Sequence, residues 1–316
     1  MKLKAGILAR LEETRDVALS GQTLAEQFGV SRNAVWKAVN ALRDEGYEIE
    51  STPNRGYRLS PVCDRLSEAG IQALLGERKV PVYRYDTVDS TNTQARRLVT
   101  EGAPEPLLVV AEEQTAGRGR RGRSFLSPRG AGLYMTVALT PGLAVESALG
   151  ITAYAAVCVA EAVQKHTGLS LQIKWVNDLY LSGRKVCGIL TEAVSDFESG
   201  TVESLLVGVG LNLRPAEMPA AIRDTVGSLA CDAPLKNALA AEITAGMLRF
   251  VPGDGAYLEA YRARSMTLGR AIRYTQGERT LFGRAVEIAP DGALTVESPD
   301  GVRHALRSGE IALLPD

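Results

Sequence analysis

"GRGRRGR", residues 117–123, places four arginines and three glycines in seven positions. Its glycines follow the G-x-G-x-x-G spacing of a dinucleotide-binding turn, which must open a helix and have an acidic residue about 20 positions further on. Pro128 and two further glycines interrupt the residues that follow, and the next carboxylate is Glu146. The segment is therefore not a Rossmann turn, and its arginines need another explanation.

The segment is instead predicted to be a flexible loop between the strands "PLLVVAEEQ" and "GLYMTVALT". A solvated basic loop is the simplest interpretation, but four guanidinium groups this close together form an unshielded positive cluster unless they meet an anion. Glycines allow the backbone to approach such an anion and to close over it. A polyphosphate or an adenylate is the ligand that clustered arginines suit best.

Two other segments carry polar groups suited to the same kind of ligand. In "KWVNDLY", residues 174–180, Lys174 stands among apolar residues, and a buried ammonium group is unfavourable unless an anion pairs with it. Asn177 and Asp178 follow at a turn-like position, where a carboxylate can meet Mg²⁺ or a ribose hydroxyl. In "DSTNTQA", three consecutive polar residues either cap a helix or hold a small polar head group: Ser90, Thr91 and Asn92.

Residues 1–62 are predicted to form a winged helix-turn-helix. The stretch "TLAEQFGVSRNAVWKAVNALRDEGYEIESTPNRGYRL", residues 23–59, contains a helix, a glycine turn, a second helix capped by Ser31 and two strand-like pieces. Val35, Val39 and Leu42 recur at the spacing of a buried helix face. The other face is polar, and its residue types contact base edges and phosphates. We therefore predict DNA binding by Ser31, Arg32, Asn33, Trp36, Lys37, Asn40 and Arg55.

The remaining chain divides into two further predicted domains. Residues 63–265 alternate strand-like and helix-like patterns, as expected for a mixed α/β catalytic domain. Residues 266–316 contain short alternating strands separated by Asp291-Gly292 and Asp300-Gly301 turns, which predict a small SH3-like β-barrel. The predicted fold class is α+β.

Composition excludes several classes of protein. The formal net charge is -1, and residues 1–60 hold nine Lys and Arg against eight Asp and Glu, so any DNA binding must come from a local patch. The four cysteines, at 63, 158, 187 and 231, form no C-x-x-C pair, which argues against a zinc site or a disulfide framework. No run of 18 apolar residues occurs, so we expect a cytoplasmic protein with no membrane partner.

Five motifs together resemble those of biotin–protein ligases: "DSTN", "QTAGRGRRGRSF", "KWVNDLYL", "KVCGIL" and "GVGLNL" occur in the order and spacing of that family. With a winged helix before them and a small barrel after them, the whole chain is similar to the bifunctional type, biotin ligase and biotin-operon repressor. Two positions depart from the family pattern. Val176 replaces the usual proline, and Phe125 stands where tryptophan is frequent.

The resemblance implies an activity and a set of site residues. The activity is ATP-dependent formation of biotinyl-5′-AMP, with Mg²⁺, and transfer of biotin to a lysine of a biotin carboxyl carrier protein. Lys174, Arg118 and Arg120 would be catalytic. Biotin would contact Ser90, Thr91, Asn92, Gln114, Arg118, Gly119, Arg120 and Lys174. ATP or the adenylate would contact Arg118, Arg120, Arg121, Arg123, Asn177, Asp178 and Asn212. Asp178 is the candidate contact for the Mg²⁺ that accompanies ATP, and no protein metal site is predicted.

The resemblance also implies regulation. Biotinyl-AMP would act as co-repressor, and it would promote a homodimer that binds operator DNA. Two alternatives remain open from the sequence. One is a lipoate or octanoyl protein ligase, which shares the fold, and the other is a DNA-binding biotin sensor without ligase activity.

Overall fold

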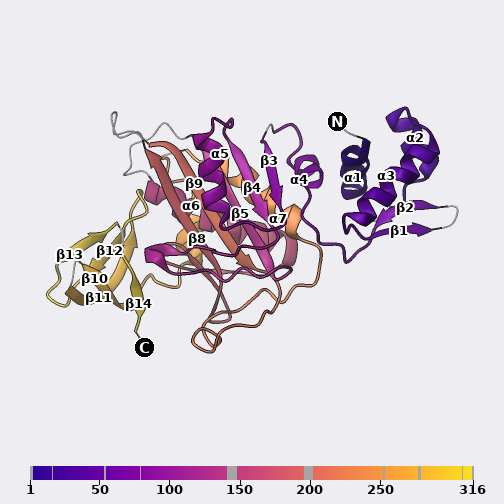
Figure 1. Ribbon diagram of the computed structural model, residues 1–316. Coiled ribbons are helices and arrows are strands. Elements are labelled where there is room, and N and C mark those ends of the chain that lie inside the picture. Colours follow the sequence, from indigo (N-terminus) through magenta and orange to yellow (C-terminus); the bar gives the residue numbers. More distant parts are fainter. Residues whose placement is uncertain are drawn as a thin grey trace.

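The computed structural model describes residues 3–15, 17–52, 55–78, 80–140, 148–195, 202–251, 253–276, 279–307 and 309–314. These residues form three units in a row, with a central sheet between an N-terminal helical unit and a C-terminal unit of short strands (Figure 1). The predicted α+β class is confirmed. Two residues of the predicted wing turn, Pro53 and Asn54, lie outside the described residues.

The N-terminal unit has the predicted order of elements: α1 (Leu3–Glu13), α2 (Gly21–Phe28), α3 (Arg32–Asp44), β1 (Ile49–Thr52) and β2 (Gly56–Leu59). Gly29 ends α2 in a left-handed conformation (φ 64°), which a glycine adopts without steric cost. Ser31 then caps α3 by accepting a hydrogen bond from the Ala34 amide. Val35, Val39 and Leu42 are buried as predicted, so the polar stripe of α3 faces outward.

The central unit is built on one mixed sheet of seven strands in the order β3-β4-β5-β9-β8-β7-β6. β3 and β4 are parallel, and the other neighbours are antiparallel. The strands are β3 (Val82–Tyr85), β4 (Leu107–Ala111), β5 (Gly132–Leu139), β6 (Gln172–Lys174), β7 (Asp178–Leu181), β8 (Arg184–Ser195) and β9 (Val202–Asn212).

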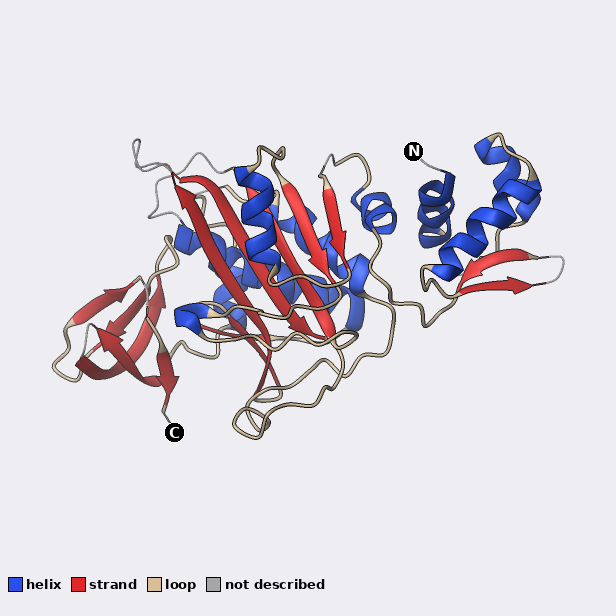
Figure 2. Cartoon of the chain, in the orientation of Figure 1, coloured by secondary structure: helices blue, strands red, loops and turns tan. Residues whose placement is uncertain are grey.

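Helices cover both faces of this sheet (Figure 2). α5 (Thr91–Thr100) packs on β4, β5 and β9 on one face. On the other face lie α6 (Ala148–Thr167), which contacts β7, β8 and β9, and α7 (Lys236–Met247), which contacts β5. α4 (Glu68–Leu75) packs on α7 and α1, and α8 (Leu258–Arg264) packs on α6. Because α5 is short, loops cover the rest of that face of the sheet.

The C-terminal unit is a five-stranded antiparallel sheet in the order β13-β12-β11-β10-β14. Its strands are β10 (Ala271–Gln276), β11 (Arg279–Ile288), β12 (Leu294–Glu297), β13 (Arg303–Leu306) and β14 (Ile311–Leu313). Gly292 and Gly301, each with φ 83°, form the two turns that the sequence predicted. The segment before β14 lies next to the sheet cavity described below.

Candidate active site

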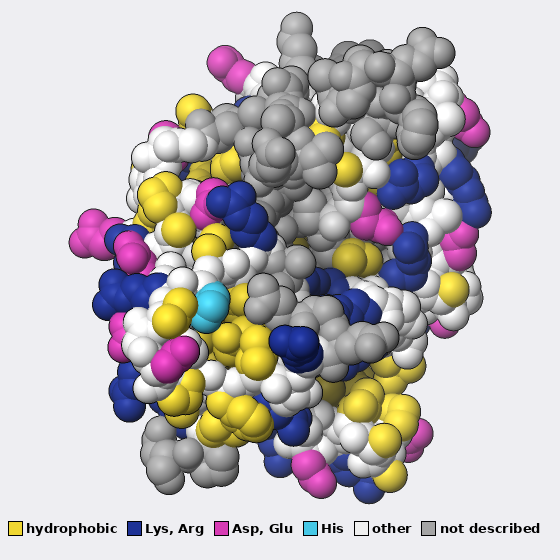
Figure 3. Space-filling model, turned by 90° about the vertical axis from the view of Figure 1, so that its left-hand side faces the viewer, with side chains coloured by type: hydrophobic (Ala, Val, Ile, Leu, Met, Phe, Trp, Pro, Cys, Tyr) yellow, Lys and Arg dark blue, Asp and Glu magenta, His cyan; other side chains and the backbone are white. Residues whose placement is uncertain are grey.

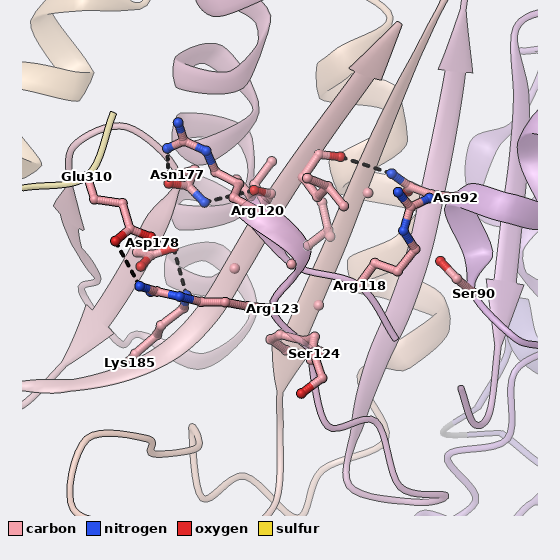
Figure 4. Close-up of a pocket in the computed structure, with 18 of the residues that line it drawn as sticks. Ser90, Asn92, Arg118, Arg120, Arg123, Ser124, Asn177, Asp178, Lys185 and Glu310 are labelled. Carbon is pink, nitrogen blue, oxygen red and sulfur yellow. Dashed lines mark hydrogen bonds and ion pairs between the residues drawn. The ribbon is translucent and has the colours of Figure 1, made fainter. Parts of the chain in front are cut away.

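A cavity lies between the start of α5, residues 117–123, which we call the arginine loop, the inner strands β8 and β9, and the segment before β14 (Figure 4). It brings together residues from segments that are far apart in sequence. The predicted site residues that line it are Ser90, Thr91, Asn92, Gln114, Arg118, Gly119, Arg120, Arg123, Lys174, Asn177 and Asp178.

One side of the cavity is a floor of hydroxyl and amide groups. The Thr91 amide donates to Gln114 Oε1 (2.8 Å), and Gln114 Nε2 donates to Ser127 Oγ (2.7 Å), so the orientation of the Gln114 amide is set. Ser90 occupies the N-cap position of α5, but its side chain makes no capping hydrogen bond. Its hydroxyl therefore remains available to a ligand. We call Ser90, Thr91, Asn92 and Gln114 the polar floor.

The arginine loop is pinned to three different parts of the protein. Arg118 pairs with Glu192 of β8 (2.9 Å), Arg120 donates to Asn177 Oδ1 (3.1 Å), and Arg123 pairs with Glu310 (2.8 Å). Backbone bonds close the loop itself, from the Gly119 amide to the Arg123 carbonyl and from the Phe125 amide to the Gly117 carbonyl.

The sequence predicted that the four arginines need a bound anion, and these pairs show that this was only partly right. Protein carboxylates already neutralise part of the arginine loop, so a bound anion is not the only group that can shield it. Glu192 and Glu310 lie 74 and 187 residues from their arginine partners, which is why sequence proximity gave no indication of them.

Two lysines face the cavity near Asp178. Lys174 and Asp178 are register partners in the β6–β7 hairpin, and Lys185 Nζ lies 2.8 Å from Asp178 Oδ1. Burial lowers the pKa of Lys174, and the neighbouring Asp178 carboxylate partly opposes that shift. Burial also lowers the pKa of Arg120. Cations held in a partly desolvated cavity interact strongly with an anionic ligand.

A strip of glycines forms the surface beneath the loop. A Cβ on Gly210 would lie 2.4 Å from the Phe125 ring, and a Cβ on Gly208 would lie 2.2 Å from Asn92 Oδ1. Gly188 is the register partner of Gly210 and also faces Phe125. Glycine inside a strand marks a close approach of another group. Here it lets an aromatic ring and a polar side chain lie directly on the sheet.

Two predicted site residues lie outside the cavity lining. Arg121 is exposed, with a left-handed backbone (φ 55°). Asn212 is buried, and its Nδ2 donates to the Gly227 carbonyl (2.9 Å). Gly227 belongs to a second cavity, lined also by Arg184, Arg214 and Arg223. Their proposed nucleotide contacts remain predictions.

Sequence reasoning missed several residues of the site. Lys185, Gly188, Gly208, Gly210 and Glu310 line the cavity, and Thr136 and Glu192 lie directly behind it. The motifs "KVCGIL" and "GVGLNL" did contain the lysine and the glycines, and glycines inside apolar strands could have indicated a close approach. Within the part of the chain that the structure describes, no three His, Cys, Asp or Glu side chains are grouped to hold a metal ion.

The predicted DNA-binding residues lie on the outer side of the winged helix. Ser31, Arg32, Asn33, Lys37 and Arg55 are exposed, and the indole of Trp36 is 52% exposed. Asn40 is half-buried and accepts a hydrogen bond from Arg43 (3.2 Å). Arg58, at the base of the wing, pairs with Glu50 and so contributes little net charge.

Charge is mixed on the face of the molecule shown in Figure 3. On the face shown in Figure 3, Lys and Arg side chains alternate with Asp and Glu side chains and form no single basic field. Among the described residues, no helix is long and apolar enough to cross a membrane.

Comparison with known proteins assigns each unit to a family. Residues 85–212 match the biotin/lipoate A/B protein ligase family, residues 4–58 match an HTH domain family, and residues 267–314 match the biotin protein ligase C-terminal domain. The class of protein is thus a ligase of the biotin and lipoate type that carries an HTH domain.

Individual relatives align with nearly the full length of this chain. The bifunctional ligase/repressor BirA of Bacillus subtilis is 31% identical over 98% of each chain, and that of Escherichia coli is 30% identical over 93% of this chain and 92% of its own. The biotin protein ligase of Aquifex aeolicus, solved with biotin and ATP, superimposes with a TM-score of 0.62 at 27% identity, covering 75% of this chain and 99% of that one. This chain belongs to the biotin protein ligase family, in its form with an N-terminal HTH domain.

Proposed function

We propose that this protein is an ATP-dependent biotin–protein ligase that also represses transcription through its winged helix. The observation that carries the ligase assignment is the cavity itself, where a polar floor and a group of cations face one another. The relatives that align over nearly the whole chain bear the name ligase/repressor, and the solved relative holds biotin and ATP.

In the first step, a carboxylate oxygen of biotin attacks the α-phosphorus of ATP. The bond from that phosphorus to the bridging oxygen of the β-phosphate breaks, and pyrophosphate leaves. The carboxylate is already ionised at neutral pH, so no protein base is required. The step needs positioning and positive charge around the phosphorus. Lys174, Lys185 and Arg120 line the cavity and would supply that charge.

In the second step, the amine of an acceptor lysine attacks the acyl carbon of biotinyl-5′-AMP. An amide forms, AMP leaves, and the amine proton passes to solvent. The acceptor is the lysine of a biotin carboxyl carrier protein. Arg118 and Arg120 lie on the loop that borders the cavity and would hold the adenylate until that lysine binds.

Magnesium fits this site as a partner of ATP. Mg²⁺ is commonly held by one or two carboxylates together with substrate phosphates, and Asp178 is a carboxylate of the cavity that pairs with Lys185. Bound there, the ion would neutralise phosphate charge. Asp178 would then have to exchange its ion pair with Lys185 for the metal.

The polar floor favours biotin over lipoate. The ureido ring of biotin has two N–H donors and a carbonyl acceptor, which hydroxyl and amide side chains can match. The dithiolane ring of lipoate has no such groups and would offer no partner to the buried Ser90 hydroxyl, which makes no capping hydrogen bond, and this is unfavourable. The floor residues are those that the sequence proposed for biotin: Ser90, Thr91, Asn92 and Gln114.

Exchange of labelled pyrophosphate into ATP tests the assignment. We expect exchange that depends on biotin and is at least a hundredfold weaker with lipoate, and we expect Lys174→Ala to lower it about a hundredfold, the typical effect of losing a transition-state contact. Transfer of biotin to a purified carrier domain tests the second step. Equal use of lipoate, or near-normal exchange by folded Lys174→Ala, would contradict the assignment.

Repression is proposed to require a dimer. One winged helix with few net charges binds DNA weakly, because affinity rises with the number of phosphates neutralised. Two copies on a two-fold operator would double the contacts. The structure offers one surface for such pairing. Strand β7 pairs with β8 only between Arg184 and Gly188, so among the described strands residues 190–194 of β8 pair with β9 alone.

Because Arg118 of the loop pairs with Glu192 within this edge segment, ligand binding and dimerisation are expected to be linked. By thermodynamic reciprocity, operator DNA must then tighten ligand binding by the same factor. An operator selected from random DNA, titrated with and without biotin plus ATP, tests this. Identical operator affinity in the two titrations would leave a ligase whose winged helix is not controlled by the ligand.

A further inference from the structure

One carboxylate behind the cavity holds two different parts of it. Glu192 lies on β8, opposite Leu206 of β9, and its side chain is only 16% exposed. Its Oε1 lies 2.9 Å from Arg118 Nη2, and its Oε2 accepts from Arg118 Nη1 at 3.4 Å and from Asn92 Nδ2 at 3.0 Å. Glu192 therefore connects the arginine loop to the polar floor.

Glu192 fixes the orientation of the Asn92 amide. Asn92 is buried, and its Oδ1 accepts a hydrogen bond from the Thr136 hydroxyl (2.7 Å), while its Nδ2 donates to Glu192 and to the Leu190 carbonyl. An amide whose two ends have different partners cannot rotate to exchange them. Thr136 in turn lies 2.8 Å from the Thr91 hydroxyl, so the chain of contacts reaches the opposite end of the floor.

Glu192 also fixes the arginine loop. The Arg118 side chain is 50% exposed and lies between two glycines, which give its backbone little stiffness of its own. Among the described residues, Glu192 is the carboxylate paired with Arg118. In Figure 4, Arg118 and Asn92 lie next to each other at the edge of the cavity. A fork-like arginine–carboxylate pair restricts both position and angle.

We propose that Glu192 is a positioning residue of the ligase, which sets the affinity for biotin by holding Asn92 and Arg118 in place. This rests on the proposed function. Glu192 does not line the cavity, so it acts through these two neighbours and not on the reacting atoms. Its loss is expected to weaken biotin binding and loosen the loop, with little effect on the chemical step.

Substitution by glutamine separates charge from shape. Glutamine has the size of glutamate, but it offers one acceptor oxygen and one donor nitrogen. The partners of Glu192 are all donors, namely Asn92, Arg118 and, at 3.9 Å, Arg96, so the nitrogen of the introduced amide would face a donor whichever way that amide turned. Glu192→Asp keeps the charge but is shorter, so it can pair with one partner and not with both. We expect the KM for biotin of Glu192→Asp to lie between the values of the wild type and of Glu192→Gln.

The experiment measures the KM for biotin and kcat in pyrophosphate exchange. For Glu192→Gln we expect KM to rise roughly tenfold or more, in line with the loss of charge-assisted hydrogen bonds, with kcat within about twofold. In an Arg118→Ala background, Glu192→Gln should raise the KM for biotin by a smaller factor.

Trypsin should cleave the ligand-free arginine loop faster in Glu192→Gln than in the wild type. Glu242→Gln, which breaks the remote surface pair with Lys165, is the matched control and should leave KM unchanged.

Two results would overturn the proposal. One is an unchanged or lower KM for biotin in an active Glu192→Gln protein, since a lower value would mean that the carboxylate competes with the ligand for Arg118. The other is a fall in kcat at constant KM. Biotin-dependent exchange by the wild type in the same assay tests the ligase assignment separately, and direct titration with biotin gives the affinity comparison without catalysis.

Discussion

Asn237 Nδ2 of α7 donates a 2.7 Å hydrogen bond to Glu12 Oε1 of α1, and the two residues are 225 positions apart in the sequence. Both are almost fully buried, at 4% and 6% exposure. The same Asn237 amide accepts from the Ser67 amide and donates to the Arg65 carbonyl. The winged helix is therefore attached to the catalytic unit through a buried polar contact that also fixes the linker.

Replacing Glu12 with alanine should weaken this attachment. The change leaves Asn237 and Arg15 without a shared acceptor, and an unsatisfied buried group typically costs about 1–3 kcal/mol. The free energy of unfolding measured in urea should fall by that amount, while the rate of pyrophosphate exchange in native buffer should not change. Glu13→Ala is the neighbouring control, because Glu13 is exposed and surface pairs such as its pair with Arg10 contribute little. Equal losses in the two variants would mean that the buried contact has no special role.

Replacing Lys185 with alanine should raise the KM for ATP by roughly tenfold or more. The change removes a cation from the cavity and leaves the Asp178 carboxylate facing the triphosphate. Adding Asp178→Asn to Lys185→Ala should restore part of the affinity if Asp178 mainly repels the triphosphate, and should lower it further if Asp178 holds the Mg²⁺ that accompanies ATP. The comparison is made in pyrophosphate exchange at saturating biotin. An unchanged KM for ATP in Lys185→Ala would contradict the prediction.

The pH dependence of kcat/KM for ATP should reflect Lys174. Burial lowers its pKa, so the free protein loses this positive charge at a lower pH than an ordinary lysine would. Activity should decline as pH rises through that lowered pKa. Between it and the ordinary value the unfolded chain still binds the proton, so stability should rise with pH there. In Lys174→Arg the alkaline decline should move to higher pH, and an unmoved decline would assign it to another group.

Replacing Gly210 with alanine should disturb the loop, because the added Cβ would lie 2.4 Å from the Phe125 ring. We expect the KM for biotin to rise at least fivefold while the fold persists. Gly188→Ala is a close control on the paired strand, since its Cβ would meet Phe125 and Lys185 at ordinary contact distances of 3.4–3.5 Å. Similar KM values for the two variants would show that the ring moves freely.

Local patterns in the sequence were sufficient for much of the fold. The Ser31 cap and the spacing of Val35, Val39 and Leu42 predicted α3 correctly, because capping and helical periodicity act within a few residues. The Asp-Gly turns of the C-terminal sheet were equally local. The motifs indicated the ligase family, and the comparisons confirmed it.

By itself, the sequence determined the capped helix α3, the Asp-Gly turns of the C-terminal strands, and which motifs carry polar and basic side chains. Only the tertiary structure decided how their charges are balanced. Glu192 and Glu310 meet their arginine partners because β8, the segment before β14 and the arginine loop converge on one face of the sheet. Such pairs depend on strand order and register over tens to hundreds of residues, and a local pattern contains no information about distances of that kind.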